Sequence, residues 1–269
     1  MNSRFRTVEI SDPAYAHEGL QFVTARSPAL GRRGDLCLWA PESSRIETLL
    51  ILLHGVYGSH WAWSLKGGVH RTAERLLAAG EIAPMVIAMP SDGLMGDGSF
   101  YLTHPRGADV ESWIVDEVPA LAKIAVPSLD SKARIAIGGL SMGGYGALRL
   151  GAKYADRFTS ISAHSSITDI EQASLFTHEQ RKDFLSCVPR QELSPLYWLR
   201  RRKDRLPRLR FDCGLSDPLI EGNRLLHRTL DAEGIDHEYE EFAGGHEWPY
   251  WREHVAGTLR FTGRPQGRG

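Results

Sequence analysis

Short runs of consecutive apolar residues recur along the chain and alternate with longer amphipathic segments. Each run is too short for a helix and rich in branched side chains, which is typical of strands buried on both faces of a parallel sheet. Two earlier segments, 20–25 and 34–40, alternate apolar and polar residues and are expected to be antiparallel strands that lead into this sheet. The strands expected from the apolar runs are 48–53, 85–89, 134–138, 158–163, 209–213 and 237–242.

Helical patterns occupy most of the segments between these runs. The expected helices are 69–79, 110–125, 142–154 and 220–233. Gly80 and Gly234 follow the first and last of them, where a left-handed glycine commonly ends a helix. Strands that alternate with helices predict an α/β fold, with a mostly parallel sheet and helices on both faces. There is no internal repeat or low-complexity linker in the sequence, so we expect one domain over residues 1–269.

Residues 165–207 interrupt this alternation. They show no buried-strand pattern, and they contain aromatic residues, among them Phe176 and Phe184, and the basic run 200–203. A long insertion inside a domain is often a lid or a binding loop, so we expect a cap-like segment here. Because the net charge of the chain is close to zero, we interpret the basic run as a solvated helix face.

The charges are balanced, with 32 lysines and arginines against 33 aspartates and glutamates and a formal net charge of -1. Such a chain has no large cationic field to hold nucleic acid or an anionic membrane, so we expect a small-molecule partner and leave a homo-oligomer open. The cysteines Cys37, Cys187 and Cys213 lie far apart without a CxxC pair, and the N-terminus lacks the apolar stretch of a signal peptide. These features favour the cytoplasm.

The most informative motif is GLSMG at residues 139–143, which follows the expected strand 134–138 and opens a helix. GxSxG in this setting is a nucleophile elbow, in which the flanking residues must be small and the serine is held in a strained backbone conformation. The helix after Ser141 directs N–H groups at a developing oxyanion. The same glycines do not fit a dinucleotide fingerprint, because Arg149 stands where the third glycine is required.

A serine nucleophile needs a base, and the base needs an orienting acid. In hydrolases with such an elbow the order along the chain is Ser, Asp or Glu, His. Asp217 follows strand 209–213, at the strand end where α/β sheets build their sites, whereas Asp212 lies within the strand and is expected to be structural. His246 follows strand 237–242 in a glycine-rich loop. The histidines that fit this pattern less well are His164, His178, His227 and His254.

An oxyanion hole needs two N–H donors about 3 Å from the developing charge. We predict that the backbone amide of Met142 is one of them. The other is expected in the loop after strand 48–53, at Val56, with Tyr57 as the alternative. His54 is expected to brace this loop, and the histidines near it show no recognised metal spacing, so we expect neither a metal nor a cofactor.

Several aromatic residues lie close to these motifs. Tyr57, Phe100 and Tyr101 fall in expected loops and are predicted to line an acyl or aryl pocket, with core packing as the equally open alternative. Trp248 and Trp251 have the i, i+3 spacing of a helix and are interpreted as core residues.

Four segments together carry a family resemblance: LLHGVYGSHW at 52–61, GLSMGGYGAL at 139–148, DCGLSD at 212–217 with Asn223, and GHEWPYW at 245–251. On these motifs the chain resembles the esterase D-like group of α/β-hydrolases, which includes feruloyl and tributyrin esterases, S-formylglutathione hydrolases and mycolyltransferases. The resemblance implies the α/β-hydrolase fold and a triad of Ser141, Asp217 and His246, in agreement with the motif order. Residues 165–207 match no subgroup, which leaves the substrate open.

The function expected from these observations is that of a serine carboxylesterase acting on short-chain acyl or aryl esters, feruloyl esters included. One alternative is an acyltransferase that uses the same acyl-enzyme with an alcohol as acceptor, and another is an S-formylglutathione-type thioesterase. A third is a hydrolase-fold protein that binds a ligand without turnover. The intact set of Ser141, Asp217 and His246 argues against this last alternative.

Overall fold

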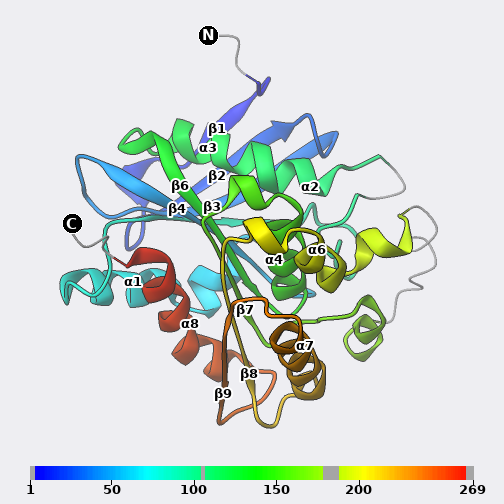
Figure 1. The fold of residues 1–269 in the computed structure, drawn as a ribbon. Coiled ribbons are helices and arrows are strands. Elements are labelled where there is room, and N and C mark those ends of the chain that lie inside the picture. The colour runs from blue at the N-terminus through cyan, green and yellow to red at the C-terminus, as the bar shows by residue number, and fades with distance from the viewer. Residues whose placement is uncertain (1–3, 104–106, 178–187, 265–269) are drawn as a thin grey trace.

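A computed structural model describes residues 4–103, 107–177 and 188–264 (Figure 1). Within these residues nine strands form one sheet, in the order β1-β2-β3-β5-β4-β6-β7-β8-β9. The strands are β1 (Val8–Ile10), β2 (Leu20–Ser27), β3 (Arg32–Trp39), β4 (Ile46–Leu53), β5 (Val86–Pro90), β6 (Leu129–Leu140), β7 (Ser160–His164), β8 (Arg208–Gly214) and β9 (Glu238–Phe242).

The sheet is antiparallel at one edge and parallel elsewhere. Strands β1, β2 and β3 pair antiparallel with one another, and β3 pairs antiparallel with β5. Strands β4 to β9 are parallel, with β4 in the centre between β5 and β6. The predicted mostly parallel sheet is therefore confirmed, and each predicted strand is present within a few residues of its expected bounds. Strand β1 was not predicted, because it is a short edge strand without buried residues and shows no apolar pattern.

Helices cover both faces of the sheet. Helices α1 and α8 lie together on one face, and α2 to α4, α6 and α7 lie on the other, each over its own apolar core (Figure 1). Gly80 and Gly234 have the left-handed φ values of +70° and +62° expected after a helix end. The helices are α1 (Val69–Ala78), α2 (Val110–Ser112), the π-helical turn η3 (Trp113–Glu117), α3 (Val118–Ala125), α4 (Met142–Lys153), α6 (Pro195–Arg201), α7 (Ile220–Ala232) and α8 (Trp248–Gly263).

The described part of residues 165–207 contains helical turns and no strand. They are η5 (Ile170–Leu175), η6 (Arg190–Leu193), α6 and η7 (Lys203–Arg205), and α6 packs against α4. Arg200 and Arg201 at the end of α6 are exposed, and Arg200 pairs with Glu233 after the end of α7, so the helical part of the basic run faces solvent as expected, whereas Arg202 is half-buried. The residues Phe184, His178 and Cys187 lie outside the described residues.

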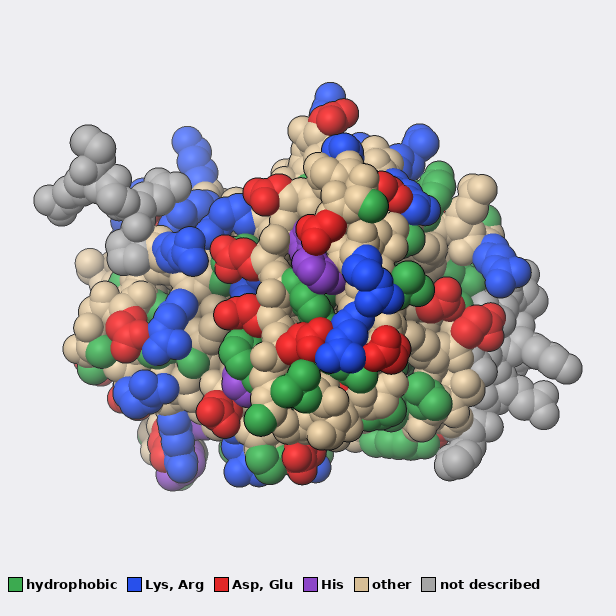
Figure 2. All heavy atoms as spheres, turned by 60° about the horizontal axis from the view of Figure 1, so that its bottom comes forward, with side chains coloured by type: hydrophobic (Ala, Val, Ile, Leu, Met, Phe, Trp, Pro, Cys, Tyr) green, Lys and Arg blue, Asp and Glu red, His purple; other side chains and the backbone are tan. Residues whose placement is uncertain are grey.

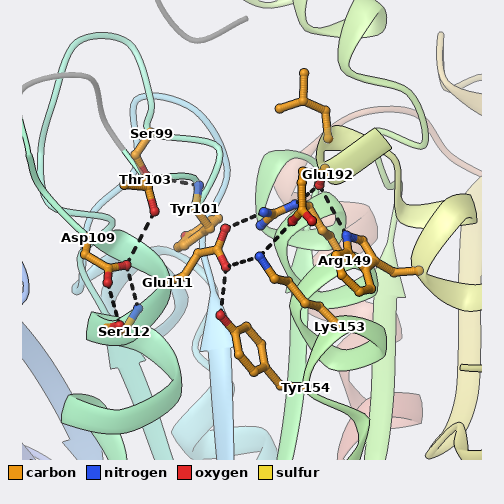
Figure 3. A network of polar contacts seen from close by, with 12 residues as sticks. Ser99, Tyr101, Thr103, Asp109, Glu111, Ser112, Arg149, Lys153, Tyr154 and Glu192 are labelled. Atoms are coloured by element: carbon orange, nitrogen blue, oxygen red, sulfur yellow. Dashed lines mark hydrogen bonds and ion pairs between the residues drawn. The ribbon is translucent and has the colours of Figure 1, made fainter. Parts of the chain in front are cut away.

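A buried polar network fixes α4 to its neighbours (Figure 3). Glu111 of α2 pairs with Arg149 and Lys153 of α4 and accepts a hydrogen bond from the hydroxyl of Tyr154. Arg149 also donates to the carbonyl of Glu192 in η6 at 2.6 Å. Burial by itself would raise the pKa of Glu111, but the Arg149 and Lys153 charges outweigh it and hold the pKa below its ordinary value. The helix that follows Ser141 is thus tied both to α2 and to the 165–207 segment.

The surface carries both charge signs side by side. On the face drawn in Figure 2, basic and acidic side chains are interspersed and no patch of one sign dominates. This distribution agrees with the near-zero net charge. In the part of the chain that the structure describes, no helix has both the length and the apolar character needed to cross a bilayer.

Candidate active site

Ser141 stands at the turn between β6 and α4, in a backbone conformation of φ 55° and ψ -118° that is costly for a residue with a side chain. A Cβ atom at Gly139 would lie 2.4 Å from the carbonyl oxygen of Gly143, and one at Gly143 would lie 2.3 Å from the carbonyl oxygen of Leu53. Both distances are far below van der Waals contact, so no larger residue fits at either position. The amide of Ser141 donates to the carbonyl of His164 at 2.9 Å, which holds the turn against β7.

The fold brings Ser141, His246 and Asp217 together in one chain of hydrogen bonds. His246 Nε2 lies 3.0 Å from Ser141 Oγ, and His246 Nδ1 lies 2.9 Å from Asp217 Oδ2. A carboxylate only accepts hydrogen bonds, so Nδ1 carries the proton and Nε2 presents its lone pair to the serine hydroxyl. Ser141 and His246, which are 105 residues apart in the sequence, thus lie in the geometry that general-base activation of a serine requires.

Asp217 is buried and held by several donors. The amide of Leu219 donates to its Oδ1 at 2.8 Å, and the hydroxyl of Ser165 donates to the same carboxylate. Burial alone would raise the pKa of Asp217. The hydrogen bond from His246, the positive charge of His246 when it is protonated, and the donors Leu219 and Ser165 outweigh burial and lower the pKa of Asp217. Asp217 is therefore held as a carboxylate facing the imidazole.

Ser165 is itself oriented by an aromatic side chain. Trp251 Nε1 donates to Ser165 Oγ at 3.2 Å, and the Trp251 ring meets the His246 ring edge to face, with 5.0 Å between centroids. Phe176 stacks on His246 at 4.4 Å between centroids. The imidazole is thus held between two aromatic rings. Ser165 and Phe176 were not among the predicted site residues, since Ser165 lies in no motif and Phe176 was visible only as an aromatic residue in the insertion.

Asp212, the competitor of Asp217, is completely buried in β8 and serves the structure. Its carboxylate lies 2.8 Å from His164 Nδ1 and 3.0 Å from an Arg210 nitrogen, and it accepts a hydrogen bond from the hydroxyl of Tyr250. Burial would raise the pKa of Asp212, but the adjacent His164 and Arg210 lower it. Its interpretation as a structural residue agrees with these contacts.

Val56 and Tyr57, the two predicted oxyanion-hole donors in the loop after β4, differ in whether their backbone amides are already hydrogen-bonded. The amide of Tyr57 donates to the carbonyl of Asp97 at 3.0 Å, so it is engaged and unsuited to bind an oxyanion. Val56 lines the same cavity as Ser141. Met142 is the first residue of α4, where an amide lacks an intrahelical acceptor. The amides of Val56 and Met142 therefore remain the candidates for the oxyanion hole.

His54 braces the loop that contains Val56, as expected. Its Nδ1 lies 2.7 Å from the carbonyl oxygen of Gly55, and its own carbonyl accepts a hydrogen bond from the Tyr101 hydroxyl at 2.9 Å. A Cβ atom at Gly58 would lie 2.6 Å from His54 Nδ1, so the loop closes tightly over the ring.

A cavity of about 460 Å³ opens over Ser141 and His246. Tyr57 lines it and is largely exposed, so its predicted contact with substrate stays a prediction. Phe100 and Tyr101 are instead buried in the core, where Phe100 packs edge-on against Tyr145, which corrects the expectation that they contact the substrate. The cavity walls include Val56, Tyr57, Trp61, Lys66, Phe176, Glu247, Trp248 and Trp251.

Trp248 and Trp251, expected in the core, do pack there and also reach the cavity. Trp251 is buried, and Trp248 meets both Trp63 and Trp251 edge to face. Lys66 lies over the Trp248 ring at 5.5 Å. One wall of the cavity is therefore a rigid group of indole rings.

Comparison with known proteins decides the family. The model of the Esterase family, described as "Putative esterase", matches residues 27–262. This chain belongs to the Esterase family. The esterase is 29% identical over 239 residues to an acetyl esterase of Caldicellulosiruptor saccharolyticus, an alignment that covers 83% of this chain and 85% of the relative. The predicted resemblance to the esterase D-like group is thereby confirmed.

Solved structures of esterases show the same fold as this esterase. A ferulic acid esterase superposes with a TM-score of 0.76 at 24% identity, covering 97% of this chain and 98% of the other. An S-formylglutathione hydrolase of Staphylococcus aureus superposes with a TM-score of 0.76 at 23% identity, covering 90% and 97%. The esterase has the α/β-hydrolase fold, and its family makes it a carboxylic ester hydrolase.

Proposed function

We propose that this esterase hydrolyses short-chain acyl esters, acetyl esters above all, with Ser141 as nucleophile, His246 as general base and Asp217 as the orienting acid. The observation that carries the proposal is the chain of hydrogen bonds from Asp217 through His246 to Ser141 at the floor of an open cavity.

In the proposed mechanism His246 takes the proton of Ser141 as Oγ attacks the ester carbonyl carbon. Asp217 stabilises the imidazolium, and the amides of Val56 and Met142 bind the oxyanion. His246 then gives its proton to the leaving alcohol, which leaves an acyl-enzyme. A water molecule, deprotonated by His246, attacks the acyl carbon, and release of the carboxylic acid restores Ser141.

Two observations support a short, uncharged acyl group. The relative from Caldicellulosiruptor saccharolyticus that aligns over most of this chain is an acetyl esterase. The walls of the cavity are mainly aromatic and aliphatic, and the charged Lys66 and Glu247 have opposite signs, so the walls favour neither an anionic nor a cationic substrate.

A substrate panel tests this preference. We expect kcat/KM to be highest for p-nitrophenyl acetate or butyrate and at least tenfold lower for p-nitrophenyl octanoate, methyl ferulate and S-formylglutathione. Initial rates for the five substrates and the products formed with and without added alcohol are measured. A preference for methyl ferulate or S-formylglutathione would contradict the proposal, and an acylated alcohol as the main product would identify an acyltransferase instead.

Ser165 offers a test of the role of Asp217. Replacement of Ser165 by alanine removes one donor from the carboxylate, and since hydrogen bonds to charged groups contribute about 1.5–3 kcal/mol, kcat is expected to fall by roughly tenfold or more with little change in KM. Ser166→Ala is the matched control, because the Ser166 hydroxyl donates to the carbonyl of Ile167 and not to Asp217. Equal kcat values for the two variants would show that Ser165 does not position Asp217.

A further inference from the structure

Two histidines and an aspartate converge at the end of the sheet opposite Ser141. His227 and Asp231 are four residues apart on α7 and therefore share one helix face. His237 immediately precedes β9 and returns beside them after the turn at Gly234. His246 follows the other end of β9, so this group lies outside the proposed catalytic machinery.

The side-chain atoms of this group have the spacing of metal ligands. His227 Nδ1 lies 2.9 Å from His237 Nε2, and Asp231 oxygens lie 3.4 Å from His227 Nε2 and 3.9 Å from His237 Nε2. One ligand atom from each of the three residues lies within 4.8 Å of the others. Two ligands of a tetrahedral Zn²⁺ at about 2.0–2.1 Å are roughly 3.3 Å apart. A single ion takes one nitrogen of His227, so either Nδ1 or Nε2 would join His237 Nε2 and an Asp231 oxygen, and the side chains would have to move from separations of up to 4.8 Å to reach that spacing.

The orientation of His237 favours a metal ligand. Its Nδ1 lies 2.8 Å from the carbonyl oxygen of Ile235 and therefore carries the ring proton. Nε2 then presents its lone pair toward His227 and Asp231. A ligating histidine usually donates its second ring N–H to a carbonyl or a carboxylate in this way.

Packing holds both imidazole rings in place before any ion binds. The His237 ring stacks on Phe211 with 5.5 Å between centroids, and the His227 ring stacks on Tyr239 at 4.6 Å. Arg224, one turn before His227 on α7, donates hydrogen bonds to both carboxylate oxygens of Glu241. The Glu241 carboxylate thus neutralises the positive charge of Arg224, so that this charge is balanced rather than directed at the two histidines.

We propose that His227, Asp231 and His237 form a structural binding site for a divalent ion of the Zn²⁺ class. Two imidazoles and one carboxylate suit Zn²⁺, Co²⁺ or Ni²⁺ far better than Mg²⁺ or Ca²⁺, which prefer oxygen ligands alone. The ion would join α7 to the start of β9. Its ligands lie on α7 and in the segment just before β9, with unequal spacing along the chain, so no recognised metal motif marked them in the sequence and no metal was expected.

Calorimetric titration with Zn²⁺ of the tag-free, chelator-treated protein tests the site, together with the visible spectrum of the Co²⁺ form. We expect one equivalent to bind in the micromolar range or tighter and the melting temperature to rise. His227→Ala and His237→Ala should abolish this binding, and Asp231→Asn, on an exposed position that does not threaten folding, should weaken it at least tenfold. His17→Ala, at an exposed histidine, is the control and should bind like wild type. Absence of binding in wild type, or unchanged binding in Asp231→Asn and His237→Ala, would overturn the proposal.

Discussion

Replacement of Ser141 by alanine is expected to lower kcat by about a thousandfold or more, with little change in KM or melting temperature. The substitution removes only the oxygen that attacks the ester carbonyl, and Cβ, the backbone conformation and the cavity all remain. The residual rate would come from the oxyanion donors and substrate positioning, since these survive the loss of the nucleophile.

Steady-state kinetics on p-nitrophenyl acetate measure this loss, and labelling with a fluorophosphonate probe locates the nucleophile. Wild type should be labelled at Ser141 and the Ser141→Ala variant should not be labelled. Ser166→Ala should keep both activity and labelling. Retention of a tenth or more of the wild-type kcat in Ser141→Ala would refute the assigned nucleophile, and labelling with no turnover of any ester would favour a binding protein.

Replacement of Glu111 by glutamine is expected to lower the free energy of unfolding by about 3–5 kcal/mol. Arg149 is fully buried, so loss of the Glu111 charge leaves a guanidinium in the interior with its main counter-charge removed. Chemical denaturation at pH 7 measures the change. Glu221→Gln is the control, because Glu221 pairs with Arg224 on the surface, where ion pairs contribute little.

The same carboxylate makes stability depend on pH. The pKa of Glu111 in the folded protein is below the ordinary value of 4.5, so its contribution to stability is fully present above that value and is lost as pH falls through the folded-state pKa. Wild type should therefore lose stability below about pH 4.5 more steeply than Glu111→Gln. Parallel curves for the two proteins, or a loss no larger than that of Glu221→Gln, would contradict the role assigned to this buried pair.

Position along the chain was enough to predict the proposed catalytic residues, because each follows a strand of the sheet: Ser141 follows β6, Asp217 follows β8 and His246 follows β9. Parallel strands end at the same edge of the sheet, so Ser141, Asp217 and His246 had to lie near one another once the strands were recognised. The residues around them were harder to predict. Phe176 reaches His246 from a segment without periodicity, and Ser165 reaches Asp217 from a turn with a positive φ.

Phe100 and Tyr101 show why loop aromatics were predicted poorly. Both have positive φ values, 52° and 55°, and both side chains are buried. Nothing in the local sequence requires this conformation for non-glycine residues. The choice between cavity and core was therefore made by the tertiary contacts with Tyr145 and His54.

The attachments of the 165–207 segment limit how the enzyme can be re-engineered. The Tyr145 hydroxyl binds the carbonyl of Leu193 and Arg149 binds that of Glu192, both from the helix that starts beside Ser141, while Phe176 rests on His246. A graft that exchanges this segment for that of a relative would disturb the imidazole as well as the cavity wall. Substrate specificity and turnover are therefore coupled through this segment. A successful chimera must keep an aromatic ring stacked on His246 and the two backbone carbonyls that accept hydrogen bonds from Tyr145 and Arg149.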